Sequence, residues 1–196
     1  MIAAIGYNLK RLFDFKGRDG RRVFWRYFLF VVLLNLIIVL GATIPGLVGV
    51  FAEASAVANP NDTAAVEAAA LDAMMEQGLP ATLVRTGLWL GLLNIILMAA
   101  SLVRRAHDSG LPGLVLLIPL GLQLVWMYFS YRQLDGLSET LRDAVETTQA
   151  GGEPAVQAGM IAQDLIGWMV VLIVVAVGMI RSQQTPNQYA DGPTNG

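Results

Sequence analysis

The sequence of 196 residues has no cysteine, a single histidine and few charged residues. The absence of cysteine excludes disulfide bonds, zinc sites built on thiolates and a thiol nucleophile. Only 14% of the residues are charged, whereas 55% are hydrophobic. A water-soluble domain of this size needs more charge on its surface than that. The composition therefore indicates an integral membrane protein.

Four long apolar runs follow one another along the chain. Each is close to the roughly 20 residues that a helix needs to cross a bilayer. We predict an all-α integral membrane protein with four transmembrane helices, at residues 24–44, 83–103, 111–131 and 161–180. Pro45 and Gly46 are expected to end or kink the first helix, and Pro119 to kink the third.

Positive and negative charges are segregated between the parts that join these runs. The N-terminal segment 1–23 and the hinge 104–110 are basic, whereas the loops 51–79 and 132–160 are rich in acidic residues. Lys and Arg are enriched on the cytoplasmic side of membrane proteins. We therefore predict that both termini, including the tail 181–196, and the hinge lie in the cytoplasm and that both acidic loops lie outside.

Short helices are predicted outside the spans as well. The N-terminal segment is amphipathic and should lie at the membrane surface up to a bend at Gly17 and Gly20. In the first acidic loop, Asp62 or Thr63 can cap a helix that Gly78 ends. In the second, apolar residues recur at helical spacing, at Leu134, Leu137, Leu141 and Val145.

The predicted topology brings three polar stretches to one membrane interface, at residues 17–26, 104–112 and 186–193. We predict a cluster there, in which Asp108 pairs with Arg18, Arg21 or Arg22. Arg104 and Arg105 are expected to bind the last carbonyls of the second helix or lipid phosphates. The candidate residues are Gly17, Arg18, Arg21, Arg22, Trp25, Arg104, Arg105, His107, Asp108, Gly110, Asn187 and Tyr189. The alternative is that each stretch only anchors its own helix end.

Three amide side chains, of Asn35, Asn94 and Gln123, fall midway along predicted spans. An amide without a partner is costly in hydrocarbon, so these residues should face other helices. Interhelical hydrogen bonds are the predicted role, and lining a polar path is the alternative. Gly87 and Gly91 form a small-xxx-small pair that permits close helix packing.

Signals for catalysis are few. His107 beside Asp108 is compatible with acid–base chemistry, but no nucleophile, phosphate-binding loop or metal-ligand cluster accompanies the pair. We predict no catalytic residues, no metal and no cofactor, and no motif indicates a nucleic-acid partner.

The hinge reads Arg-Arg-Ala-His-Asp-Ser-Gly from Arg104 to Gly110. It resembles the Arg-Arg-Leu-His-Asp-x-Gly signature of a bacterial inner-membrane family, domain of unknown function 805. The stretches 15–25, 118–119 and 185–189 are also similar to motifs of that family. Ala106, Pro112 and Leu114 depart from its usual Leu, Ser and Trp. The resemblance implies a small helical membrane protein without an assigned activity.

These observations predict a non-enzymatic protein of the bacterial inner (plasma) membrane. Its basic inner face would bind anionic phospholipid or a protein partner, which could be another membrane protein or a second copy of the chain. The alternative is a small transporter or channel subunit with a polar path at Asn35, Asn94 and Gln123. A continuous polar cavity would favour transport, and a deep pocket holding His107 and Asp108 would favour catalysis.

Overall fold

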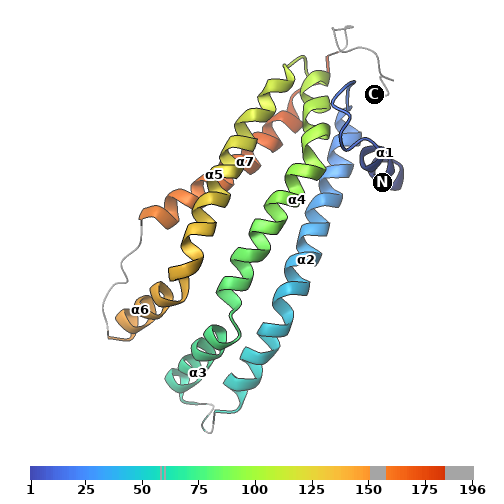
Figure 1. The fold of residues 1–196 in the computed structure, drawn as a ribbon. Helices are drawn as coiled ribbons and strands as arrows, with labels where there is room; N and C mark the ends of the chain where they lie inside the picture. Colours follow the sequence, from blue (N-terminus) through green and yellow to red (C-terminus); the bar gives the residue numbers. More distant parts are fainter. Residues whose placement is uncertain (58, 60, 151–157, 184–196) are drawn as a thin grey trace. The chain divides into compact units, whose positions relative to one another are not determined.

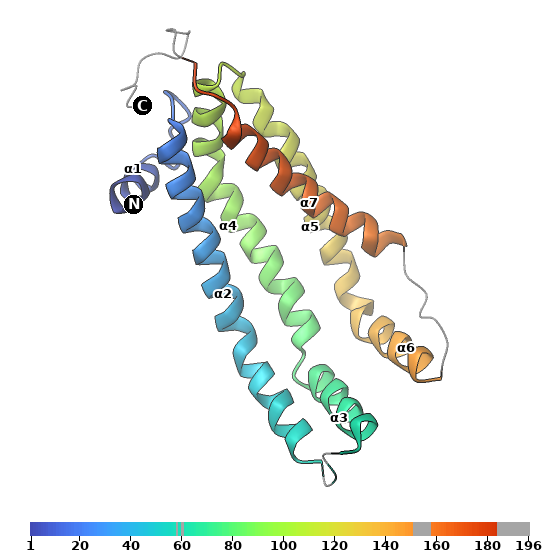
Figure 2. The same ribbon diagram turned by 180° about the vertical axis from the view of Figure 1, so that it is seen from behind.

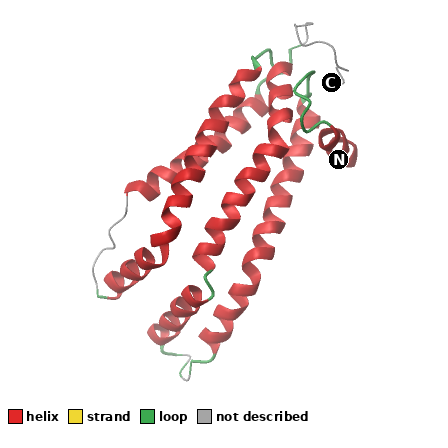
Figure 3. Ribbon diagram, viewed as in Figure 1, coloured by secondary structure: helices red, strands yellow, loops and turns green. Residues whose placement is uncertain are grey.

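The computed structural model describes residues 1–57, 59, 61–150 and 158–183, and over these residues it is helical, with no strand (Figure 3). This confirms the predicted all-α class. The elements are, in chain order, α1 (Ile2–Lys10), α2 (Arg21–Ser55), α3 (Thr63–Glu76), α4 (Leu79–Asp108), the 3-10 helix η1 (Gly113–Leu116), α5 (Leu117–Gln133), the 3-10 helix η2 (Leu134–Gly136), α6 (Leu137–Gln149) and α7 (Ala158–Met179).

Three helical stretches are long and apolar enough to cross a membrane. They are Arg21–Ser55 with 35 residues, Leu79–Asp108 with 30 and Gly113–Gly136 with 24. They contain the first three predicted spans, apart from residues 111–112. The fourth predicted span, 161–180, coincides with α7, whose apolar part Gln163–Met179 is shorter. The chain is therefore a helical protein with three candidate membrane spans in the residues described.

Two helices run past the points at which the sequence predicted their ends. Helix α2 continues through Pro45 and Gly46 to Ser55, so these residues do not end it, and a kink is the remaining alternative of that prediction. An interior proline removes one backbone hydrogen bond, and the many bonds on either side sustain the helix. Helix α4 continues to Asp108, so residues 104–108 of the predicted hinge belong to this helix.

Pro119 does not lie deep inside a helix, because it is the third residue of α5. A proline in the first turn removes an N–H group that has no partner within the helix anyway. The kink predicted at this residue is therefore not required.

Contacts divide the chain into two compact units. One comprises Met1–Asn35, Leu90–Tyr128 and Ala158–Gly196. Its core includes Phe24 and Tyr27 of α2, Leu102 of α4 and Val177 of α7. The Tyr27 hydroxyl donates to the carbonyl of Leu97 at 3.0 Å, which ties α2 to α4. Helix α1 lies beside the start of α2 and the end of α4 (Figures 1 and 2).

The other unit comprises Leu36–Trp89 and Phe129–Gln157. It contains α3 and α6, the short helices of the two acidic loops. Asp62 caps α3 by accepting a hydrogen bond from the Ala65 N–H at 3.1 Å, so of the two predicted caps, Asp62 and Thr63, it is Asp62 that is used. Gly78, with φ of +61°, lies between the end of α3 and the start of α4. Helix α6 confirms the helix that was predicted from the spacing of apolar residues in the second acidic loop. The sequence therefore predicted these local signals correctly.

Candidate functional site: a buried charge cluster

The C-terminal end of α4 is buried and makes many side-chain hydrogen bonds. Every residue from Ser101 to Ser109 is buried, and the side chains of Arg104 and Arg105 are 0% exposed. An arginine side chain stays charged in proteins, so a buried one needs acceptors for its donors. Five charged residues meet here, Arg18, Asp19, Arg104, Arg105 and Asp108, and we call them the buried charge cluster.

Arg104 binds the segment that precedes α2. Its Nε donates to Asp19 Oδ1 at 2.9 Å, and one terminal nitrogen donates to Asn8 Oδ1 at 2.6 Å. The other terminal nitrogen donates to the backbone carbonyls of Arg11, at 2.9 Å, and Asp14. A single guanidinium therefore holds α1 and the α1–α2 connection against α4.

Asp19 is as deeply buried as its partner, with 1% of its surface exposed. Its carboxylate also accepts from the Ser101 hydroxyl at 3.1 Å, and its backbone N–H donates to the Arg104 carbonyl at 3.1 Å. Burial raises the pKa of Asp19 above its ordinary value, and the Arg104 guanidinium and the Ser101 hydroxyl partly oppose this rise. The charge on Asp19 thus depends on Arg104.

Asp108 is the centre of the other half of the cluster. Arg18 Nε donates to its Oδ1 at 3.2 Å, while the Arg105 guanidinium and the Ser182 hydroxyl donate to its Oδ2. Of the three arginines predicted to pair with Asp108, Arg18 is the one that does. Both carboxylate oxygens therefore accept hydrogen bonds from within the protein.

The segment that follows α7 is bound by the same residues. Arg105 donates to the carbonyls of Gly178, at 3.4 Å, and Ile180. Arg18 donates to the Gln183 carbonyl at 2.6 Å, and the Gln183 N–H donates to the Asp108 carbonyl at 2.8 Å. The last carbonyls of a helix have no partner within it, and here arginines supply the donors.

The prediction that Arg104 and Arg105 bind the last carbonyls of their own helix is therefore wrong. Arg104 binds carbonyls before α2, and Arg105 binds carbonyls at the end of α7. With 0% exposure, neither guanidinium is open to a lipid phosphate. The end of α4 instead joins two segments that are distant in sequence.

The other residues predicted for this cluster differ in burial and in the contacts they make. The His107 side chain is buried, interacts with the backbone of Gly17 and lies against Gly113, where an added Cβ would be 2.9 Å from its Nε2. Trp25 packs edge-to-face on Phe24 with ring centroids 5.8 Å apart. Arg21 is exposed and donates to the Met179 carbonyl, and Arg22 is exposed. Asn187 and Tyr189 lie outside the described residues.

Four polar members of the network were absent from the sequence prediction: Asn8, Asp19, Ser101 and Ser182. Asp19 carried a signal, because it is one of only two acids among the basic residues of segment 1–23. The other three have no local signal, since short polar side chains are common at helix ends.

Gly110 ends α4 with φ of +76°. The Leu111 N–H donates to the Ala106 carbonyl at 2.9 Å and the Gly110 N–H to the His107 carbonyl at 3.1 Å, which is the Schellman arrangement. A Cβ on Gly110 would also collide with the side chain of Gln183. The glycine that closes the hinge motif is therefore needed for the backbone.

We expect Gly110→Ala to lower the free energy of unfolding by about 1–2 kcal/mol, because alanine disfavours the left-handed conformation. Thermal unfolding in detergent micelles would measure the change. Gly121→Ala is the matched control, since a Cβ there has open space within α5 and alanine favours a helix. Equal midpoints for the two variants would contradict this role of Gly110.

Exposed cations lie outside the buried charge cluster, near the N-terminus. Lys10, Lys16, Arg21, Arg22 and Arg26 are all exposed. Large apolar side chains are exposed among them, with Ile2 at 87%, Phe13 at 77% and Phe15 at 42%. We call Ile2, Lys10, Phe13, Phe15, Lys16 and Arg22 the N-terminal collar. Mixed cationic and aromatic surfaces of this kind are typical of segments at a membrane interface.

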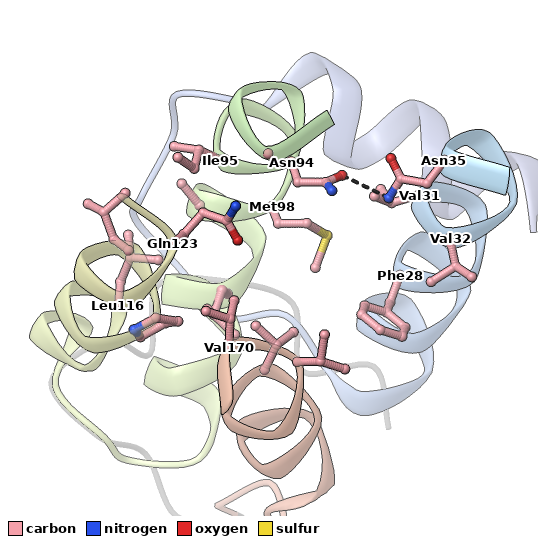
Figure 4. Close-up of a pocket in the computed structure, with 17 residues that line it drawn as sticks. Phe28, Val31, Val32, Asn35, Asn94, Ile95, Met98, Leu116, Gln123 and Val170 are labelled. Carbon is pink, nitrogen blue, oxygen red and sulfur yellow. Dashed lines mark hydrogen bonds between the residues drawn. The ribbon is translucent and has the colours of Figure 1, made fainter. Parts of the chain in front are cut away.

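The three predicted amides come together in one pocket of about 270 Å³, which we call the amide pocket (Figure 4). Asn35 Nδ2 donates to Asn94 Oδ1 at 3.0 Å, which confirms a hydrogen bond between α2 and α4. Gln123 of α5 lines the same pocket beside Gly91, where a Cβ would lie 2.7 Å from its Nε2. The other lining side chains have no hydrogen-bonding group, and neither His107 nor Asp108 is among them.

The sequence profile described as "Protein of unknown function (DUF805)" matches residues 12–191. The chain belongs to the DUF805 family. The match covers nearly the whole sequence and includes every residue of the buried charge cluster, so the resemblance based on the hinge motif is confirmed. The searches of curated proteins and of solved structures gave no match.

Proposed function

We propose that this DUF805 protein is a non-enzymatic, four-span protein of the bacterial inner membrane whose N-terminal collar binds anionic phospholipid headgroups. The exposed collar carries the proposal. Its cationic side chains are exposed, whereas the two arginines of the hinge motif are buried and bonded to other parts of the protein. Phe13 and Phe15 would enter the headgroup boundary while Lys10, Lys16 and Arg22 meet phosphates.

The proposed topology uses α7 as the fourth span and keeps both termini in the cytoplasm. Its apolar part, Gln163–Met179, is at the short end of the range for a membrane helix. The basic N-terminal segment supports the cytoplasmic placement, and the anionic lipids of the inner leaflet would attract it. An even number of spans then places the collar and residues 180–183 in the same compartment.

The use of the polar groups supports a binding role over catalysis and transport. Asp108 has both oxygens bonded, and the amide pocket is mostly apolar rather than a continuous polar path. A protein partner on the collar, or a second copy of the chain, is the competing proposal. It would require contacts that do not depend on lipid charge.

We expect the triple variant Lys10→Ala, Lys16→Ala, Arg22→Ala to bind phosphatidylglycerol about 100-fold more weakly than the native chain. The reason is that each cation near an anionic surface contributes about 1 kcal/mol. Native mass spectrometry from mixed micelles of phosphatidylglycerol and phosphatidylcholine would measure the retained lipid.

The matched control removes three exposed cations elsewhere, in Arg85→Ala, Arg132→Ala, Arg142→Ala. Both triple variants change the net charge equally, so a general charge effect would affect them alike. The proposal predicts loss of phosphatidylglycerol only in the collar variant. Equal retention in the two variants, or no preference over phosphatidylcholine in the native chain, would reject it.

A further inference from the structure

The amide pocket has three polar side chains among otherwise apolar walls. It lies among α2, α4, α5 and α7, and 14 of its 17 lining residues are apolar or glycine while three are amides. Figure 4 shows the side chains of Asn35, Asn94 and Gln123 around one side of the space, with Phe28 and Val170 farther round its wall.

One amide atom of this site has no partner in the described residues. Asn35 uses its Nδ2 to bond Asn94, but its Oδ1 is buried and accepts no hydrogen bond. A buried acceptor without a donor is destabilising, because it has lost its hydrogen bonds to water and gained none in the protein. The pocket therefore offers a bound molecule the energy of an unmade hydrogen bond, in addition to the burial of its apolar surface.

From this geometry we infer that the pocket is a binding site for an uncharged, ring-bearing molecule that carries one hydroxyl group. The apolar walls exclude an ionised ligand, because no charged side chain lines the pocket. A hydroxyl can donate to Asn35 Oδ1 and can also accept from the neighbouring amides. This site is separate from the N-terminal collar and does not depend on its function.

Size narrows the ligand class further. An engineered apolar cavity of about 150 Å³ holds benzene. The pocket of about 270 Å³ therefore has room for a fused pair of rings. A saturated acyl chain could enter the apolar part, but it has no donor and would leave Asn35 unsatisfied. The hydroxyl is thus the feature that separates a specific ligand from bulk lipid.

Two probes of the same shape test the inference. 1-Naphthol carries the hydroxyl, and 1-methylnaphthalene has a methyl group in its place. Equilibrium dialysis against nanodiscs with and without the full-length protein gives the retention that depends on the protein. We expect 1-naphthol to bind about tenfold more tightly than 1-methylnaphthalene, after correction for partition into empty nanodiscs.

Variants locate the site. Asn35→Leu should reduce the preference for 1-naphthol to near unity, whereas Thr43→Val should keep it. Thr43 is a matched polar residue of α2 outside the pocket, bonded to its own helix at the Val39 carbonyl. Ala99→Leu, which places a larger side chain on the pocket wall, should lower the retention of both probes.

Three results would overturn the inference. One is retention of 1-naphthol no greater than in empty nanodiscs, and another is equal binding of the two probes by the native chain. The third is an unchanged preference in Asn35→Leu. If Asn35→Leu does not fold, as judged by circular dichroism and gel filtration, the Ala99→Leu variant decides, and unchanged retention there rejects the site.

Discussion

Arg104→Met is expected to lower the free energy of unfolding by about 3–5 kcal/mol. The substitution leaves the Asp19 carboxylate buried without its cation. Removing one partner of a buried ion pair typically destabilises a protein by that amount. It also removes the donors that hold α1, through Asn8 and the Arg11 carbonyl. Thermal unfolding in micelles should show the loss, and amide exchange in residues 2–14 should rise.

The pH dependence of this variant separates charge from packing. Without Arg104, the pKa of Asp19 rises further above its ordinary value of 3.8. A carboxyl group whose pKa is raised in the folded state contributes stability that is fully present below its unfolded-state pKa of about 3.8. This contribution is lost as the pH rises through the folded-state pKa. The deficit of Arg104→Met should therefore shrink as the pH is lowered from 7 towards 4.

A second substitution tests the same pair. Adding Asp19→Asn to Arg104→Met should recover part of the lost stability, because the double variant no longer buries a lone charge. Arg22→Ala, at an exposed arginine, should change stability by less than about 0.5 kcal/mol. A deficit that is the same at every pH and is not relieved by Asp19→Asn would contradict the assignment.

Asp108→Asn is expected to destabilise the protein by about 3 kcal/mol, because Arg18 and Arg105 would then be buried without a carboxylate. The effect should be local to the end of α7. Hydrogen–deuterium exchange should increase in residues 178–183, whose carbonyls and N–H groups are held by these residues, and should change less in α1.

Asp143→Asn is the matched control for this variant, since Asp143 is an exposed aspartate on α6. It should leave both stability and exchange unchanged. The two cluster variants also control each other, because Arg104→Met should loosen α1 while Asp108→Asn loosens residues 178–183. The same exchange pattern in both variants would mean that the cluster is not divided as the contacts indicate.

The sequence predicted the features that depend on local chemistry. Apolar runs identified the long helices, and the Asp62 cap and the spacing in 137–145 identified the short ones. Charge segregation led to the region where Arg18 meets Asp108, although these residues are 90 positions apart. The predicted topology placed Asp108 at the same membrane interface as only a few arginines, so a small set of ion pairs could be proposed.

The partners of Arg104 and Arg105 could not be predicted. Arg104 and Arg105 are neighbours in sequence, yet they point to different segments, because successive residues on a helix face about 100° apart. Nor could the pattern locate the end of α4, since a basic last turn and a basic loop look alike in sequence. Three-dimensional packing decided both, through the burial of residues 101–109.

The membrane threading is tested most directly by thiol labelling, because the native chain has no cysteine and any introduced thiol is unique. Four exposed positions are suitable, in the single variants Lys16→Cys, Glu67→Cys, Asp143→Cys and Arg181→Cys. In intact spheroplasts, a membrane-impermeant maleimide should label positions 67 and 143, and it should reach positions 16 and 181 only after lysis. Labelling of 16 and 181 from opposite sides would contradict the account.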